Sequence, residues 1–201
     1  MANTAAAGAL AAAYAGVSQK FSGHSPALAR KAMARMAAPA CSSPRSLAGT
    51  AGSVGSTGGI GSAARFTYPY GVATDSFGTV YVADTFNHMI RRIAQNGTVS
   101  TMGGVAGTRG TTDGGVGTSR FAYPTGIAVD TQGFVYVADS QNSTIRKLTQ
   151  GNVTSTIAGT AGSFGSADGA ALTVARFNQP SGVTVDSSGV VYIADTFGHT
   201  I

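Results

Sequence analysis

The sequence lacks several features that would point to common classes of protein. Its one cysteine, Cys41, excludes an internal disulfide and a metal site built from several thiolates. All 8 acidic residues are aspartate, tryptophan is absent, and only 10% of the residues are charged. No uncharged apolar run reaches about 18 residues, so the sequence predicts no helix that spans a bilayer.

The formal net charge of +5 is carried by the N-terminal part of the chain. Residues 1–64 hold five basic side chains and no acidic one, whereas residues 65–201 hold eight of each. The second part is therefore formally neutral. The net charge is consequently no argument for a nucleic-acid-binding patch on that part.

Residues 1–47 form an Ala-rich, low-complexity N-terminal segment without acidic side chains. A basic, Ser-containing composition without acidic residues is typical of an organelle transit peptide. Residues 5–17 also resemble a weak secretory signal, although no charged residues precede the apolar run. The alternative is a disordered segment without a targeting role. The sequence therefore leaves the compartment open.

One short stretch occurs three times and organises the rest of the chain. It reads Val80-Tyr-Val-Ala-Asp84, then Val135-Tyr-Val-Ala-Asp139, then Val191-Tyr-Ile-Ala-Asp195, at offsets of 55 and 56 residues. Repetition at a fixed period of this length indicates a repeat architecture. The sequence therefore predicts that residues 48–201 consist of successive copies of one unit.

Each complete unit predicts four antiparallel strands. An Asp-x-x-Gly segment favours a type I turn between the first two strands, and a Gly/Asn pair favours a tight hairpin between the last two. In the first copy the predicted strands are residues 71–75, 80–84, 89–93 and 98–102. In the second copy they are residues 126–130, 135–139, 144–148 and 153–157. The pattern contains no helix.

The second strand of each unit is apolar on both faces, which indicates a sheet that is covered on both sides. Without helices, the cover must be another copy of the same sheet. The sequence therefore predicts an all-β fold, an incomplete β-propeller of four-stranded antiparallel blades, preceded by the Ala-rich segment.

The unit resembles the NHL repeat. The resemblance rests on the shared pattern Pro-x-Gly-[Val/Ile]-x-x-Asp-x-x-Gly-x-Val-Tyr-[Val/Ile]-Ala-Asp, and the triplet that names the family is matched by Asn87-His88-Met89. It covers residues 48–201, with about two full repeats plus fragments. It implies a propeller but no particular function, because one fold hosts unrelated activities.

The number of units predicts uncovered sheet faces. Propellers close with about four to eight blades, whereas only two units here are whole. We expect the array to be a fragment of a larger propeller, or to self-associate through its uncovered blade ends.

The predicted binding face is the rim that carries the Gly-rich connectors between units. The connection between the second and third strands emerges on this same rim. One connector position varies between copies, as Val54, Arg109 and Phe164. We expect Phe86, His88, Arg109 and Phe164 to form a binding surface there, although sequence drift at exposed loop tips would give the same pattern.

No catalytic residue, metal ligand or cofactor is predicted. The repeated Asp84, Asp139 and Asp195 suit a scaffold role, because an aspartate at a strand end accepts hydrogen bonds from the next turn. Some NHL-type propellers are zinc-binding lyases, but His88 and His199 alone fall short of the three or four ligands that zinc needs.

The leading interpretation is a non-catalytic binding or scaffolding module that presents one propeller face to a protein or other polymer. The alternative is a fragment of a lyase-like or lactonase-like propeller enzyme whose catalytic residues lie in other blades. RNA binding through Arg91-Arg92 and Arg146-Lys147 is a lesser alternative, because strand alternation partly covers one member of each pair and no aromatic residues are interleaved.

Overall fold

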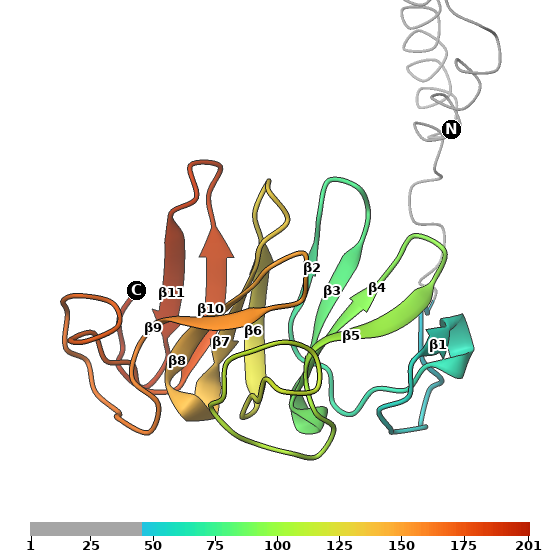
Figure 1. Cartoon of the computed structure of the whole chain (residues 1–201), viewed down its shortest axis with the longest axis horizontal. Helices are drawn as coiled ribbons and strands as arrows, with labels where there is room; N and C mark the ends of the chain where they lie inside the picture. Colours follow the sequence, from blue (N-terminus) through green and yellow to red (C-terminus); the bar gives the residue numbers. More distant parts are fainter. Residues whose placement is uncertain (1–45) are drawn as a thin grey trace, which may run out of the picture. The chain divides into compact units, whose positions relative to one another are not determined.

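The computed structural model describes residues Ser46–Ile201, which form three antiparallel sheets arranged in chain order (Figure 1). Within this range no helix is long and apolar enough to cross a membrane. The predictions made for residues 1–45 lie outside the described residues.

The first sheet has five strands in the spatial order β1-β5-β4-β3-β2. Their bounds are β1 Gly59–Ile60, β2 Val72–Thr74, β3 Val80–Asp84, β4 Met89–Ile93 and β5 Thr98–Gly104. The second sheet follows the order β6-β7-β8-β9, with β6 Pro124–Val129, β7 Val135–Asp139, β8 Thr144–Leu148 and β9 Thr154–Ala158. The third sheet consists of β10 Pro180–Val185 and β11 Val191–Asp195.

The predicted four-stranded blades are confirmed for the first two units, with two local differences. The short strand β1 adds to the outer edge of the first sheet by pairing with β5. Single-turn 3-10 helices also occur in the connections, at η1 Gly61–Ala63, η2 Thr85–Asn87 and η3 Ser140–Asn142.

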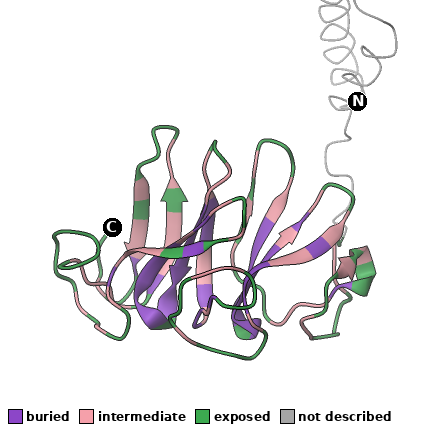
Figure 2. Ribbon diagram, viewed as in Figure 1, coloured by how far each residue is buried: buried purple, intermediate pink, exposed green. Residues whose placement is uncertain are grey.

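The main core lies between the first and second sheets. The first sheet contributes Tyr81, Ala83, Ile90 and Met102. The second contributes Ile127, Val135, Val137 and Leu148, and the connector before it contributes Phe121. All five residues of β7 are buried, whereas β11 of the third sheet is mostly half-buried (Figure 2). In the middle unit, the two-sided apolar strand β7 is thus covered by neighbouring copies, as the sequence predicts.

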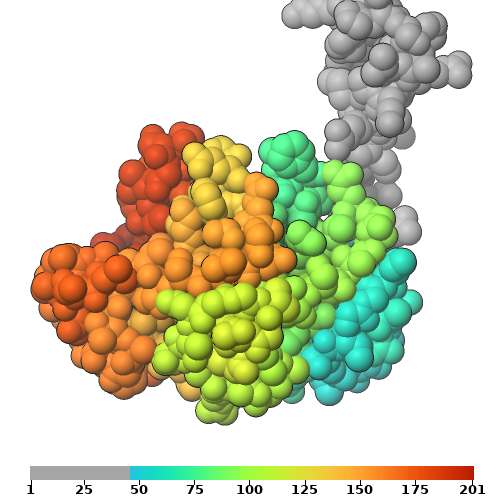
Figure 3. Space-filling view, in the orientation of Figure 1, coloured from blue at the N-terminus to red at the C-terminus, as the bar shows by residue number. Residues whose placement is uncertain are grey.

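The two rims of the array differ in their connections. The short hairpin turns lie at one rim, the top in Figure 1. There Gly78 has a φ of 82°, and its main-chain N–H donates to the carbonyl of Asp75 at 3.1 Å. The long connectors lie at the opposite rim, where residues 105–123 form a continuous surface in Figure 3. Below, this second rim is called the connector rim.

Candidate functional site

Asp84 closes β3 and accepts three hydrogen bonds inside the first unit. Its Oδ1 accepts from the main-chain N–H of Thr67 at 2.8 Å, and its Oδ2 accepts from Asn87 Nδ2 at 2.7 Å and from Arg91 Nη1 at 3.2 Å. The side chains of Asp84 and Arg91 are fully buried. This carboxylate therefore joins turns and strands together, in agreement with the predicted scaffold role.

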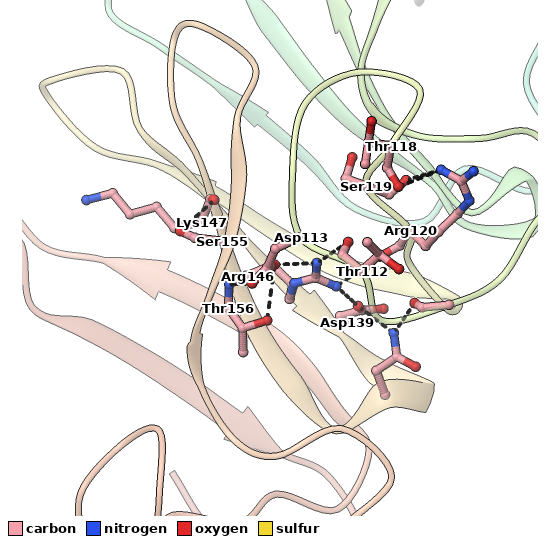
Figure 4. Close-up of polar contacts among 12 residues, drawn as sticks. Thr112, Asp113, Thr118, Ser119, Arg120, Asp139, Arg146, Lys147, Ser155 and Thr156 are labelled. Carbon is pink, nitrogen blue, oxygen red and sulfur yellow. Dashed lines mark hydrogen bonds and ion pairs between the residues drawn. The ribbon is translucent and has the colours of Figure 1, made fainter.

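Arg146 takes the equivalent place in the second unit and pairs with two carboxylates (Figure 4). Its guanidinium lies 2.8 Å from Asp139 and 2.7 Å from Asp113, and it donates to the carbonyl of Thr112 at 3.0 Å. Asp113 also accepts from the main-chain N–H of Thr156 at 2.9 Å. The second connector is thereby fastened to β9.

Burial acts strongly on the aspartates of this scaffold. It raises the pKa of Asp139 to about 6, whereas Arg146, the Ala122 N–H and Asn142 act in the opposite direction. Burial likewise raises the pKa of Asp84, against its own three donors. Both carboxylates are held by surrounding donors rather than by solvent.

The sequence predicted that one residue of each basic pair is partly covered, but the structure buries it completely. Arg91 and Arg146 have no exposed surface. Each guanidinium can be buried because a buried carboxylate neutralises its charge. These two side chains are therefore out of reach for RNA. Arg92 and Lys147, their neighbours in sequence, are half-buried.

A row of aromatic rings lies on the connector rim at the junction of the first two sheets. The ring centroids of Tyr68 and Phe86 are 4.9 Å apart, with the planes tilted at 49°. The centroids of Phe86 and Tyr123 are 5.1 Å apart, with the planes perpendicular at 90°. Exposure reaches 69% for Tyr68 and 51% for Phe86. Such pairs add stability beyond the area that they bury.

Two further side chains, those of Arg109 and His88, contact the ring of Tyr123. The Arg109 guanidinium lies 4.5 Å from the ring centroid of Tyr123, and its Nη2 donates to the Tyr123 hydroxyl at 2.5 Å. The His88 ring meets the same tyrosine edge-on at a centroid distance of 4.6 Å. We call Tyr68, Phe86, His88, Arg109 and Tyr123 the rim cluster.

The backbone holds the rim cluster in unusual conformations. His88 ends η2 with a φ of 59°, and Tyr123 has a φ of 50°. Gly104 has a φ of 88°, and a Cβ placed there would stand 2.2 Å from the carbonyl oxygen of His88. The Thr85 hydroxyl donates to the Pro124 carbonyl at 2.8 Å, across the junction. The cluster is therefore built on fixed turns and not on a free loop.

The structure brings three of the four predicted site residues together and places the fourth at another junction. It brings Phe86, His88 and Arg109 together around Tyr123. Phe86 and Arg109 are exposed, but His88 is only 5% exposed and supports Tyr123 from below the surface. Phe164 is also exposed but belongs to the next junction, where its backbone pairs with that of Phe177.

Tyr68 and Tyr123, the two tyrosines of the rim cluster, were not among the residues predicted from the sequence. A signal was present, because each stands directly before the proline of its unit, where the third unit has Gln179. The role of this position depends on rings from neighbouring units, and the pattern of one unit does not show them.

The described part of the chain contains no group of three His, Cys, Asp or Glu side chains placed to hold one metal ion. The protonation state of His88 depends on its surroundings. Burial lowers its pKa below 6.5, and the nearby Arg109 lowers it further. The imidazole therefore stays neutral and can accept a hydrogen bond.

Comparison with known proteins assigns the repeats. The NHL repeat model matches residues 121–148 and 177–201. The chain is an NHL-repeat protein. The matched segments cover β6, β7 and β8 of the second sheet and both strands of the third.

Curated relatives extend the likeness to the other NHL repeats. The chain is 31% identical over 153 residues to NHL repeat-containing protein 2 of Gallus gallus. It is 33% identical over 90 residues to the chloroplastic protein SUPPRESSOR OF QUENCHING 1 of Arabidopsis thaliana. These alignments cover 69% and 44% of this chain, but only 21% and 8% of the relatives.

A solved structure supports the fold. An auxiliary nutrient-binding protein from Bacteroides thetaiotaomicron superposes with a TM-score of 0.59 at 23% identity, over 65% of this chain and 35% of the other. At this identity the likeness concerns the fold alone. The NHL array described here thus corresponds to a small part of much longer proteins.

Proposed function

We propose that this NHL-repeat array is a non-catalytic binding module and that the connector rim is the face it presents to a protein or another polymer. The proposal assigns residues 48–201 to the binding module and residues 1–47 to a separate leader. It further assigns the rim cluster as the centre of the contact surface.

The exposed aromatic row is the observation that carries this proposal. Tyr68 and Phe86 leave most of their ring surface in solvent, although neighbouring rings fix their positions. Tyr and Arg are enriched among the residues that contribute most to binding at protein interfaces. Rings that are held in place before binding lose little conformational freedom when a partner arrives.

The repeats themselves supply variants that test the rim without disturbing the fold. Gln141 stands where the first unit has Phe86, Gln179 stands where the second has Tyr123, and Val54 stands where the second has Arg109. The triple variant Phe86→Gln/Tyr123→Gln/Arg109→Val therefore carries residues that the same backbone already accepts. Phe77→Gln is the matched control, because Phe77 is an exposed ring at the opposite rim and Gln132 is its equivalent.

The experiment measures binding of the labelled 201-residue chain to peptide and glycan arrays. We expect signals that fall at least about tenfold in the triple variant, a loss on the order of 1.4 kcal/mol or more, and that persist in Phe77→Gln. Signals that survive in the triple variant, or that depend on Phe77, would refute the proposed face. Stoichiometric zinc or calcium together with turnover of lactones would support the propeller-enzyme alternative instead.

A further inference from the structure

The rim cluster continues into a hollow on the connector rim, and this continuity bears on what the module binds. The hollow has a volume of about 560 Å3 and is lined by apolar or small residues, among them Val54, Phe66, Tyr68 and Pro69. No charged side chain lines it. Tyr68 belongs both to the hollow and to the aromatic row. A ligand can therefore extend from the hollow across Phe86 to Tyr123.

The rings form a ridged surface instead of a flat one. Successive centroids are 4.9 and 5.1 Å apart, and the planes turn by 49° and then by 90°. Neighbouring rings are thus in contact and inclined to one another along the row. A polyproline II helix rises about 3.1 Å per residue with three residues per turn, so one turn is about as long as this row. Proline-rich segments bind in aromatic-lined grooves of this kind, because their extended conformation exists before binding.

Arg109 gives the row a charged end. Its guanidinium is stacked against Tyr123 and uses Nη2 for the tyrosine hydroxyl. A guanidinium has five N–H donors in a planar fork, so donors remain for a bidentate bond to a carboxylate. The buried carboxylate of the first unit, Asp84, is already paired with Arg91. The cation at the end of the row therefore favours an acidic group on the ligand.

We infer that the rim cluster binds an extended, proline-rich peptide segment with an acidic residue at the Arg109 end. The inference rests on the proposed binding function and specifies the partner. Prolines lie against Tyr68, Phe86 and Tyr123, and an aspartate or glutamate pairs with Arg109.

Fluorescence anisotropy with the 201-residue chain and three labelled peptides tests this assignment. The first peptide is a proline hexamer followed by two aspartates, the second ends in two lysines, and the third replaces the prolines by alternating Gly and Ser. We expect saturable binding of the first peptide. The lysine peptide should bind at least about tenfold more weakly, because it loses a charge-assisted bond. The Gly-Ser peptide should not saturate.

Single variants then assign the two halves of the peptide. Phe86→Gln and Tyr123→Gln should each weaken the first peptide about tenfold or more. Arg109→Val should remove the preference for aspartate over lysine while retaining part of the affinity. Phe77→Gln, at the opposite rim, should bind all three peptides as the parent chain does. Circular dichroism melts of the same samples confirm that each variant is folded.

Equal binding of the aspartate and lysine peptides, or binding that survives both aromatic substitutions, would overturn the inference. Failure of the first peptide to saturate would overturn it as well. Array signals that still depend on the rim cluster would then show that the proposed function holds for another ligand. Loss of every rim-dependent signal would refute the proposed function together with the inference.

Discussion

The main-chain N–H of Tyr123 donates to Nδ1 of His88 across 3.3 Å, from the second unit to the first. The bond requires a neutral imidazole with its proton on Nε2, because a protonated Nδ1 cannot accept. The second junction uses the same geometry with a different acceptor, since Gln179 N–H donates to the Ser143 hydroxyl at 3.4 Å. Both acceptors have a left-handed backbone, with φ values of 59° and 54°.

His88 makes the stability of the array depend on pH. Its pKa in the folded chain lies below the ordinary value of 6.5. Below pH 6.5 the unfolded chain therefore binds a proton that the folded chain does not. The stabilisation from neutral His88 is present above pH 6.5 and is lost as the pH falls towards the folded-state pKa. Urea unfolding at pH 7.5 and pH 5.5 measures the difference.

His88→Ser is the matched variant for this prediction, because Ser143 occupies the equivalent position. The hydroxyl keeps an acceptor for the Tyr123 N–H but does not titrate. We expect the variant to lose less stability between pH 7.5 and pH 5.5 than the parent chain. An unchanged slope would show that His88 does not carry the pH dependence.

Two glycines, one at the end of β5 and one in the connector that follows, should differ in their tolerance of alanine. Gly104 and Gly107 both have positive φ, at 88° and 69°. A Cβ at Gly107 meets nothing within 4 Å, whereas one at Gly104 stands 2.2 Å from the His88 carbonyl oxygen. Gly107→Ala should cost about 1–2 kcal/mol for the left-handed backbone. Gly104→Ala should cost roughly 1–3 kcal/mol more, because the backbone of His88 must move.

The next repeat supplies an independent check of the glycine prediction. Gly159 and Gly162 are the equivalents of the first pair, and a Cβ at Gly159 would lie close to the Ser143 carbonyl while one at Gly162 meets nothing within 4 Å. Chemical denaturation of all four alanine variants should show the same order in both connectors. Equal losses within either pair would contradict the steric explanation.

Removing Asp84 should be among the most damaging changes in the first unit. Asp84→Ala leaves the buried Arg91 guanidinium without the carboxylate that neutralises it. Breaking a buried pair in this way costs about 3–5 kcal/mol. Asp75→Ala is the control, since Asp75 lies at the opposite rim and accepts from Phe77, Thr79 and Tyr81 near solvent. It should cost only about 1 kcal/mol in urea unfolding.

The outer face of the first sheet should promote self-association. Val72 and Val82 are paired across β2 and β3, and both line an apolar hollow of about 350 Å3 on that face. Val72 is 66% exposed. Exposed apolar surface of this kind drives association. We expect light scattering to give a mass above the 20.0 kDa of one chain.

Val72→Lys should shift that mass towards the monomer, because it places a charge on the apolar face. Val116→Lys is the control, as Val116 is also an exposed valine but lies in a connector. A parent chain that is monodisperse at the monomer mass would contradict the prediction, as would an equal effect of both lysine variants.

Strand positions were predictable because they depend on local patterns. Four strands begin and end at the predicted residues, namely β3, β4, β7 and β8, because turn residues bound each apolar run. β1 was not predicted, because Gly59–Ile60 pairs with β5 through its backbone and carries no strand pattern of its own. Full burial of Arg91 was also missed, since carbonyls of Ser56 and Thr57 in the preceding connector help to surround it.

The rim cluster shows why only part of the site was predictable. Phe86, His88 and Arg109 were predicted from connector geometry and, for Arg109, from variation between copies, and their role in binding stays a prediction. Their grouping around Tyr123 depends on the packing of one unit against the next, which the repeat pattern does not encode. Phe164 shares its connector position with Arg109 but lies at a different junction.

The hydroxyl bonds between units have a consequence for how such arrays arise. Thr85 donates to the Pro124 carbonyl, and Ser140 donates to the Pro180 carbonyl, so each copy carries both halves of the same joint. A tandem gene duplication would therefore deliver a new blade with its fastening already in place. Arrays of different length can then evolve without inventing a new interface, while the exposed tips diverge to suit new ligands.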